Sequence, residues 1–446
     1  MKKITFVLVV LLCLSLWGCA KENDSSAASQ ESTGHQHIFE DWHLSRVATC
    51  KYEGVETRKC TECGFEEERA TPKEPHSFRN NTKICKVCQY VDLSGDETVV
   101  EMGNMTIYAY DYGSVATYAW DVMVWDGVIF RGAGDYDKNS GDTSFWTFDL
   151  AEGRWSSTGT ATDEAIHRFV EIDGKLYAPG IDSRDGSGWD LGNYYVLEDG
   201  KWQKVRNVPQ GIHCFDMIGH DGKMFIGTGT GESQKVVAVS TDKGQSWTYL
   251  PMYKDGQLMD ASGHDQGWSR CYEFVEYDGK LYALVSFKEA DGYVREIFVY
   301  EGDKMVYVAD CPFSGRVSRN YWQSKFEFNG KCYITANGLY AIADFAKPET
   351  HKKIEMPNKE MVSDAIIYNN EIYVLSCLFN ENDTVETVIY KSATGEEGSF
   401  TEVVRFNYGA RSYSFDYDGT YFYVGTGMAL STDYNNQVGM LLRVKP

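Results

Sequence analysis

The sequence predicts an all-β protein whose larger part is built from one repeated hairpin. Of its 446 residues 14 % are aromatic, and 42 Gly stand against only 9 Pro, which favours many short strands joined by glycine turns. After Glu101, a pattern of alternating apolar residues, a turn and an aromatic pair recurs seven times, at intervals of 40 to 57 residues. A period of this length with four strands per unit is typical of a β-propeller, so seven hairpins predict seven blades.

Each copy of the hairpin turns on two residues that tolerate positive φ, as tight hairpin turns require. A second pair of apolar segments follows each hairpin and completes a unit of four strands. The turns lie at Asp126-Gly127, Asp173-Gly174, Asp221-Gly222, Asp278-Gly279, Asn329-Gly330, Asn369-Asn370 and Asp418-Gly419.

The last repeat lacks its fourth strand. After its hairpin the chain has one clear strand, residues 438–444, before Pro446. One unpaired strand, residues 105–110, precedes the first hairpin. We expect this strand to complete the last blade and close the ring, which removes exposed strand edges. The propeller would then span residues 104–446 and follow a linker at residues 93–103.

One turn in the third repeat carries a family resemblance. Residues 240–247 resemble an Asp-box, also called a BNR repeat, with Ser240, Asp242, Gly244 and Trp247 at the four signature positions. The resemblance implies a turn between the third and fourth strands of a propeller blade. Asp-box propellers include sialidases, so the chain is similar to a sialidase-like superfamily, although no catalytic residue can be carried over from it.

The N-terminus indicates the compartment. Lys2 and Lys3 precede an apolar run at residues 4–17, which is shorter than the ~20 residues needed to span a bilayer and reads as a secretory signal. The run ends in a sequence that resembles a bacterial lipobox, which implies that residues 1–18 are removed and Cys19 is lipidated. A plain signal peptide with an incidental Cys is the alternative.

The segment after the predicted cleavage site has no aromatic residue. Residues 19–34 therefore cannot bury an apolar face and predict a flexible tether. We expect a lipoprotein on the extracellular face of the bacterial cell membrane.

Residues 35–92 form a module rich in Cys and His. Its two C-x-x-C pairs have the spacing that lets two thiolates reach one tetrahedral Zn²⁺. The segment contains one full and one shortened copy of a repeat in which a His precedes a C-x-x-C pair. It resembles the His/Cys repeat modules of secreted Gram-positive proteins. The first copy offers His37, Cys50, Cys60 and Cys63, and the second offers His76, Cys85 and Cys88.

A module of fewer than sixty residues without a continuous apolar core needs a cross-link. We expect structural zinc in a zinc-ribbon-like fold, and the fourth ligand of the second copy is His35, a water or nothing. A single site made of the four Cys of the two pairs is one alternative. Disulfides, which suit an oxidising exterior, are the other.

A ligand site is expected on the axial loop face of the propeller. There the loops that enter the inner strands meet those that join the second and third strands of each blade. Arg with flanking Trp and Tyr suits a sugar that carries a carboxylate, through bidentate pairing and stacking. The candidate ligand-binding residues are Arg168, His213, Trp268, Arg270, Glu273, Arg319, Trp322, Arg411 and Tyr413.

Polar residues also recur at one level of the repeat. They can form a ligand-binding ring around the axis, or they can pair across blades or order central water. The ring, six residues before the second turn residue of each hairpin, comprises Asp121, Arg168, Asp216, Glu273, Ser324, Asp364 and Tyr413.

The net charge of the chain limits the classes of ligand that it can bind. The formal net charge of −22 repels phosphate backbones and disfavours nucleic-acid binding. We expect a monomer that binds a glycan or a cell-envelope protein. The alternative is a sialidase-like glycoside hydrolase or a lyase acting on an acidic sugar, for which Asp216 and Glu273 are the first carboxylate pair to consider.

Overall fold

The computed structural model describes residues 35–79, 82–104, 118–134, 142–183, 190–230, 236–259, 269–289, 292–313, 323–336, 338–380, 384–427 and 437–446. The chain divides into two compact units, Met1–Glu74 and Pro75–Pro446. Residues 75–92, expected in the Cys- and His-rich module, therefore group with the larger unit. In the described part of the chain the only helical segment is the 3-10 turn η2 (Pro348–Thr350). No helix among these residues is long and apolar enough to cross a membrane.

The described part of the smaller unit is a three-stranded antiparallel sheet, in the order β1 (His43–Arg46), β2 (Gly54–Lys59) and β3 (Glu66–Thr71). The guanidinium groups of Arg58 and Arg69 lie over the ring of Trp42, 4.5 and 4.3 Å from its centroid. Every residue of β1 is exposed. Because this sheet buries little apolar surface, a metal cross-link would add much to its stability.

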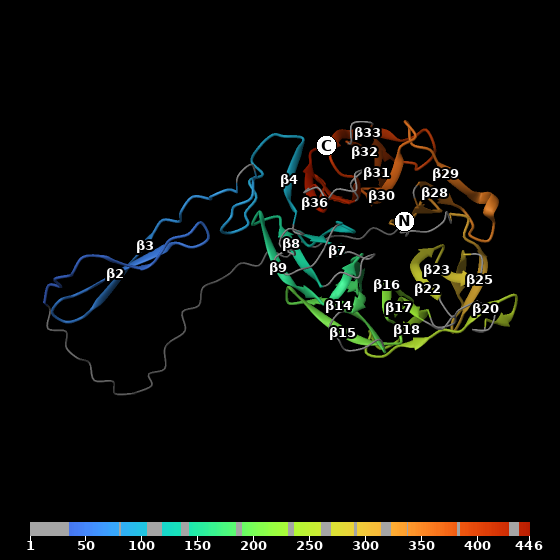
Figure 1. Ribbon diagram of the computed structural model, residues 1–446, viewed down its shortest axis with the longest axis horizontal. Coiled ribbons are helices and arrows are strands. Elements are labelled where there is room, and N and C mark those ends of the chain that lie inside the picture. The colour runs from blue at the N-terminus through green and yellow to red at the C-terminus, as the bar shows by residue number, and fades with distance from the viewer. Residues whose placement is uncertain are drawn as a thin grey trace, which may run out of the picture. The chain divides into compact units, whose positions relative to one another are not determined.

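In the larger unit, four-stranded antiparallel sheets are arranged around a common centre, as in a β-propeller (Figure 1). Six of the inner hairpins turn as predicted, with positive φ at both turn residues: at Asp126 and Gly127, for example, φ is 48° and 74°, as a type I′ turn requires. In the last hairpin the prediction of a two-residue turn is wrong, because four residues separate the paired Tyr417 and Phe422. Four of the sheets, in chain order, are β5 (Val122–Trp125), β6 (Val128–Arg131), β8 (Thr143–Asp149) and β9 (Arg154–Ala161); β11 (Val170–Ile172), β12 (Lys175–Pro179), β14 (Leu191–Glu198) and β15 (Lys201–Pro209); β26 (Lys325–Phe328), β27 (Lys331–Thr335), β28 (Leu339–Ile342) and β29 (His351–Ile354); and β30 (Met361–Tyr368), β31 (Glu371–Phe379), β32 (Val385–Ser392) and β33 (Thr401–Tyr408).

Two further four-stranded groups are joined in one larger sheet. Strand β17 pairs with β22 near the centre, through Gly229 with Arg270 and Thr230 with Ser269. Strand β16 likewise pairs with the short strand β13, through His213 with Ile181. The members are β16 (His213–His220), β17 (Lys223–Thr230), β18 (Val237–Ser240) and β19 (Thr248–Tyr249); β22 (Ser269–Tyr277), β23 (Lys280–Glu289), β24 (Gly292–Tyr300) and β25 (Met305–Asp310); and the short strands β7 (Ala133–Gly134), β10 (Asp163–Ile166), β13 (Ile181–Ser183), β20 (Met252–Lys254) and β21 (Gln257–Leu258).

The last sheet combines the two ends of the larger unit. It contains β34 (Ser412–Tyr417), β35 (Phe422–Thr426), β36 (Met440–Val444) and β4 (Val99–Asn104). Strand β4 lies in the segment expected to be a linker, which corrects that expectation, whereas residues 105–110 lie outside the described residues. Burial alternates along β4: Val100 and Met102 are buried, while Glu101 accepts a hydrogen bond of 2.8 Å from the Tyr408 hydroxyl.

The turn at residues 240–247 joins β18 to β19, the third and fourth strands of their group. The Ser240 hydroxyl accepts a hydrogen bond of 2.8 Å from Gly244 N, and Asp242 accepts one of 2.9 Å from Ser246 N. Trp247 donates from Nε1 to Asn207 Oδ1 of the neighbouring sheet at 3.1 Å. The turn is thus closed by its own side chains and attached to the strand beside it.

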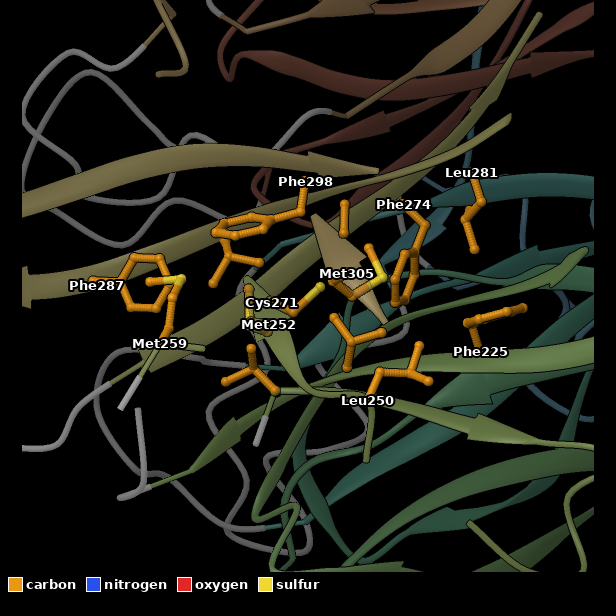
Figure 2. Close-up of a cluster of buried hydrophobic side chains, with 14 residues drawn as sticks. Phe225, Leu250, Met252, Met259, Cys271, Phe274, Leu281, Phe287, Phe298 and Met305 are labelled. Atoms are coloured by element: carbon orange, nitrogen blue, oxygen red, sulfur yellow. The ribbon is translucent and has the colours of Figure 1, made fainter. Parts of the chain in front are cut away.

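Apolar side chains fill the spaces between neighbouring sheets. One such core lies between the groups β16–β19 and β22–β25 (Figure 2). Phe225, Phe274 and Phe298 are all fully buried in it. Burial of one such side chain stabilises the folded state by about 1.5–3 kcal/mol, so the packed sheets give the central loops a rigid support.

Candidate functional site

A belt of polar residues runs around the centre of the larger unit at the start of the inner strands. We call it the axial belt: Asp121, Arg168, Asp216, Glu273, Ser324, Asp364 and Ser414. It differs from the predicted ring at one position, because Ser414 replaces Tyr413. The reason is the turn of the last hairpin. Four residues separate the paired Tyr417 and Phe422, whereas only two separate His220 and Lys223 in an ordinary repeat. The centre of the last turn therefore lies one residue further along the chain, and the belt position moves with it.

The axial belt ties each sheet to the next. Its acceptor side chains receive the backbone N–H of an inner strand in the following sheet. Phe169 donates to Asp121 at 2.8 Å, Phe274 to Asp216 at 2.8 Å, Ala365 to Ser324 at 2.7 Å and Phe415 to Asp364 at 3.0 Å. The Ser414 hydroxyl donates to Ala119 O at 2.9 Å. Pairing across blades, one of the two interpretations of the predicted ring, therefore accounts for these side chains.

Four charges meet inside the axial belt. Arg168 and Lys325 each contact both Asp216 and Glu273, and Lys325 Nζ lies 2.6 Å from Glu273 Oε2. Burial opposes ionisation of Asp216, but the cations Lys325 and Arg168 outweigh it and lower the pKa of this carboxyl. Burial raises the pKa of Glu273 in spite of the same cations. Arg168 and Glu273 are thus engaged with protein charges, and the pair Asp216 and Glu273 is neutralised by the chain itself.

A cavity of about 460 Å³ lies on the turn side of the axial belt. Its lining includes Asp364 and Asp416 among apolar residues such as Met217. Burial raises the pKa of Asp364 to about 7 and that of Asp416 to about 6. These carboxyls share the cavity as partly protonated groups, and Asp416 also accepts a hydrogen bond of 2.7 Å from Val124 N.

The loop side of the axial belt is aromatic over half of its circumference. The residues immediately before the belt in the first four repeats, which we call the aromatic arc, are Trp120, His167, Phe215 and Tyr272. The ring centroids of Trp120 and His167 are 4.7 Å apart, as are those of Phe215 and Tyr272. Phe215 and Tyr272 lie at β-bulges in β16 and β22, where an extra residue re-aims a side chain.

Arg270 and His213 stand beside the aromatic arc. The Arg270 guanidinium lies 5.6 Å from the centroid of the Phe215 ring, and its Nη1 is 3.5 Å from the Tyr272 hydroxyl. Its Nη2 is 3.4 Å from His213 Nε2. Nδ1 of His213 contacts the carboxylate of Asp182. These groups present a cation, an imidazole and aromatic faces at one place.

Arg411 and Tyr413 approach the other end of the aromatic arc. The Arg411 guanidinium lies 5.4 Å from the Tyr413 ring centroid, and its Nε donates to Ser363 Oγ at 3.3 Å. The Tyr413 ring is 5.4 Å from that of Trp120. Of the other predicted ligand-binding residues, Trp268, Arg319 and Trp322 lie outside the described residues.

Sequence reasoning missed several residues of this site. Phe215 and Tyr272 share one column of the repeat, seven residues before the turn glycine, and reading that column could have found them. Lys325 follows a predicted ring residue directly. Asp182 has no such signal, because it lies on the short strand β13 outside the hairpin pattern.

The Cys- and His-rich residues form groups that could hold a metal. In the smaller unit, ligand atoms of His35, His37, Cys60 and Cys63 all lie within 4.8 Å of one another. His35 thus takes the place expected for Cys50 in the first group. The reason is local: His35 and His37 shortly precede Phe39, whose bridge to Cys60 brings both imidazoles to the turn of the C-x-x-C pair.

The distances in this first group suit zinc. Cys60 Sγ is 3.6 Å from His35 Nε2, and Cys63 Sγ is 3.3 Å from His37 Nδ1. Tetrahedral Zn²⁺ with bonds of about 2.3 Å to sulfur and about 2.0–2.1 Å to nitrogen separates such ligands by about 3.6 Å. Cys60 and Cys63 are free thiols. In the larger unit, His76, Cys85 and Cys88 are grouped in the same way, with Cys88 Sγ 3.4 Å from His76 Nδ1.

Comparisons with known proteins assign no family. No protein-family model matches the sequence, and no curated protein matches it. Solved structures that resemble it include the computationally designed Ika8 protein, with 8 % identity, 74 % of this chain and 97 % of that chain covered, and a TM-score of 0.42. YCF48 bound to D1 peptide has 11 % identity, 75 % and 93 % coverage and a TM-score of 0.43. Polysaccharide lyase Uly1 has 10 % identity, 74 % and 90 % coverage and a TM-score of 0.42. At such low similarity these likenesses carry no functional argument.

Proposed function

We propose that the larger unit binds an acidic glycan at the loop side of the axial belt. The observation that carries the proposal is the position of Arg270, whose guanidinium lies near the Phe215 ring and beside the Tyr272 hydroxyl. A guanidinium is preorganised to bind a carboxylate through two hydrogen bonds, and aromatic faces bind the apolar faces of sugars. Arg270 thus places a positive charge, which can pair with the carboxylate of an acidic sugar, beside the aromatic arc.

The strongly acidic chain does not oppose this site at physiological salt. Charges further apart than the Debye length of about 8 Å are largely screened, so local groups decide whether an anion binds. Arg270 and His213 supply those groups at one end of the aromatic arc, and Arg411 supplies a cation at the other. A uronic-acid chain laid across the arc would meet a cation near each end.

We also propose that the larger unit has seven blades and that β4 closes the ring. The repeated four-stranded groups support the count. Two features support the closure: β36 pairs with β4, and the last sheet bonds to the first through Ser414 to Ala119 O and Val124 N to Asp416. In this arrangement the axial belt is a continuous circuit beneath the glycan site.

The N-terminal part would hold this site at the cell surface. We propose that Cys19 carries the lipid anchor and that residues 19–34 are the tether, on the sequence evidence alone. We further propose structural zinc at His35, His37, Cys60 and Cys63, because two thiolates and two imidazoles at these separations match its tetrahedral preference. Zinc would supply the cross-link that the exposed three-stranded sheet lacks.

Titration calorimetry with oligouronides tests the glycan proposal. We expect saturable binding that carboxyl-reduced oligosaccharides do not reproduce. Arg270→Ala should weaken it about 10- to 100-fold, since a hydrogen bond to a charged group contributes about 1.5–3 kcal/mol. Arg270→Lys should weaken it less. The control is Arg405→Ala on the outer strand β33, where Arg405 pairs with Glu402 at 2.7 Å.

Two results would contradict the proposal. One is unchanged affinity in folded Arg270→Ala. The other is binding to an envelope protein extract with no affinity for any uronide, which would indicate a protein partner instead.

A further inference from the structure

A buried carboxylate orients the imidazole at the glycan site. Asp182 is buried, and its carboxylate contacts Nδ1 of His213. The backbones of β13 and β16 fix this contact, because Ile181 pairs directly with His213. Asp182 has φ of 55°, in the left-handed region that Asp tolerates better than most residues. The pairing of β13 with β16 therefore holds the Asp182 side chain against the His213 imidazole.

The contacts of His213 define its tautomer. Nδ1 faces a carboxylate, which can only accept, so the proton resides on Nδ1. Nε2 faces the Arg270 guanidinium at 3.4 Å, which can only donate, so Nε2 carries a lone pair. Burial opposes ionisation of Asp182, but the hydrogen bond from His213 outweighs it and lowers the pKa of the carboxyl. The carboxylate is thus ionised and ready to stabilise a positive imidazolium.

The same geometry places three chemical functions within reach of one sugar. The guanidinium of Arg270 lies between Nε2 of His213 and the hydroxyl of Tyr272, at 3.4 and 3.5 Å. A carboxylate bound to this guanidinium would therefore lie near both His213 and Tyr272. The Tyr272 hydroxyl, an acceptor from Arg270, carries a proton of its own. A base and an acid thus lie on either side of one carboxylate anchor.

We propose that His213 and Asp182, with Arg270 and Tyr272, cleave a uronic-acid polymer by β-elimination. This rests on the proposed binding of an acidic glycan. Arg270 binds the C6 carboxylate and withdraws charge from C5, which makes the C5 hydrogen more acidic. Nε2 of His213 removes that proton, and Asp182 stabilises the imidazolium.

The bonds and protons balance without a co-reactant. The C5–H bond breaks and its electrons form the C4=C5 double bond, while the C4–O4 bond breaks. The leaving O4 takes the proton of the Tyr272 hydroxyl. The tyrosinate then regains a proton from the His213 imidazolium, directly or through water. The products are one chain with a new reducing end and one with an unsaturated uronate, and no water is consumed.

The rival pair of carboxylates does not fit a hydrolytic mechanism as well. Asp216 and Glu273 are both in contact with Arg168 and Lys325. Two carboxylates neutralised by two cations of the protein are poorly placed to donate and accept protons at a sugar. His213, by contrast, has a lone pair on Nε2, which faces the Arg270 guanidinium, and its side chain is 19 % exposed.

The experiment incubates the full-length protein with polygalacturonate, hyaluronan and other polyuronates and records the ultraviolet absorbance of the C4=C5 bond. We expect absorbance to rise with at least one polymer and not with its carboxyl-reduced form. His213→Ala should lower the rate about 10²- to 10⁴-fold, the usual contribution of a general base. Its binding affinity should stay within a few-fold of wild type, because Arg270 is intact. Tyr272→Phe should also lower the rate, and Arg405→Ala should leave it unchanged.

Asp182 acts through His213 and is a positioning residue, so its test is the pH profile. Asp182→Asn should lower the rate and move the acid limb of the pH–rate profile to lower pH, because the imidazolium loses its stabilising charge. Asp182→Glu should restore part of the rate. A merely structural role would leave the limb in place.

The outcomes separate this inference from the proposed function. Saturable binding of uronides without any unsaturated product would overturn the catalytic inference and leave glycan binding intact. Cleavage that persists in folded His213→Ala would overturn the assignment of the base. Absence of binding to every uronide would overturn both.

Discussion

The backbone N–H of Phe415 donates a hydrogen bond of 3.0 Å to Oδ2 of Asp364, across the boundary between two four-stranded sheets. Asp364 also accepts from the Ser324 hydroxyl, so one buried carboxyl group links three strands. Even with these donors, burial raises its pKa to about 7. A group that joins sheets in this way also makes the stability of the larger unit depend on pH.

We predict that Asp364 makes the protein less stable as pH rises from about 4 to about 7. An unfolded Asp has a pKa of about 3.9. Between that value and about 7 the folded state therefore binds more protons than the unfolded state, and stability falls with rising pH. A difference of one between the folded and unfolded pKa corresponds to about 1.4 kcal/mol. Ionisation of Asp364 alone therefore lowers the free energy of unfolding by up to about 4 kcal/mol across this pH range.

Denaturant unfolding at pH 5 and pH 8 measures this effect. Asp364→Asn keeps an acceptor but cannot ionise, so the difference between the two pH values should shrink. Asp278→Asn, at an exposed hairpin turn where Asn tolerates positive φ, is the matched control. An equal difference in wild type and Asp364→Asn would contradict the prediction.

Lys325→Met should destabilise the protein strongly. Lys325 is one of two cations that face Asp216 and Glu273, and its loss leaves excess buried negative charge. Removal of one partner from a buried ion pair costs about 3–5 kcal/mol. The added change Glu273→Gln should recover part of this loss, which a double-mutant cycle would detect.

The control for that cycle is Lys175→Met, whose exposed pair with Glu198 spans 3.2 Å. Exposed pairs contribute about 0–1 kcal/mol, so little change is expected. If Lys325→Met and Lys175→Met cost the same, the four-charge cluster does not stabilise the centre.

His35→Ala should lower the zinc content of the full-length protein by one ion. His35 Nε2 lies 3.6 Å from Cys60 Sγ, and a tetrahedral structural site has no surplus ligand. His43→Ala is the control, because His43 lies outside the group and pairs with Glu40. Elemental analysis after dialysis against a weak chelator gives the stoichiometry. Full zinc occupancy in His35→Ala would return Cys50 to consideration as the ligand.

Asp242→Ala should lower the melting temperature near neutral pH and have less effect in acid. Hydrogen bonds from Ser246 and Ser240 lower the pKa of Asp242 to about 2. A carboxyl group whose folded pKa is depressed adds stability above its unfolded value of about 3.9 and loses it as pH falls through about 2. Thermal melts of wild type and variant should therefore converge at low pH. A difference that is constant with pH would mean that charge is not involved.

The repeated hairpins could be predicted because their signal is local. Turn residues such as Asp221 and Gly222 specify positive φ directly, and the alternating residues around them specify the buried face. The position of β4 was harder to predict. Apolar residues alternate in residues 105–110 as well as they do around Val99 and Val100. Only the pairing with β36 decides which of the two segments enters the sheet.

The contacts of the site could be predicted only in part, because they join residues from different repeats. Arg168 was expected to face a ligand, yet its partners Asp216 and Glu273 come from the next two repeats. The exchange of Tyr413 for Ser414 depends on the length of one turn. His35 takes the place of Cys50 because a backbone bridge between Phe39 and Cys60, which has no sequence signature, brings the His35 side chain to Cys60.

The pairing of β4 with β36 sets the order in which the larger unit can assemble. Leu442 of β36 lies opposite Glu101 of β4. Strand β4 is synthesised before all the repeats, so it cannot pair until β36 has been synthesised after them. During synthesis, β4 would remain an unpaired strand while the intervening sheets form. Contacts of such long sequence separation form slowly. The edge of β4 is therefore covered only at the final step of folding.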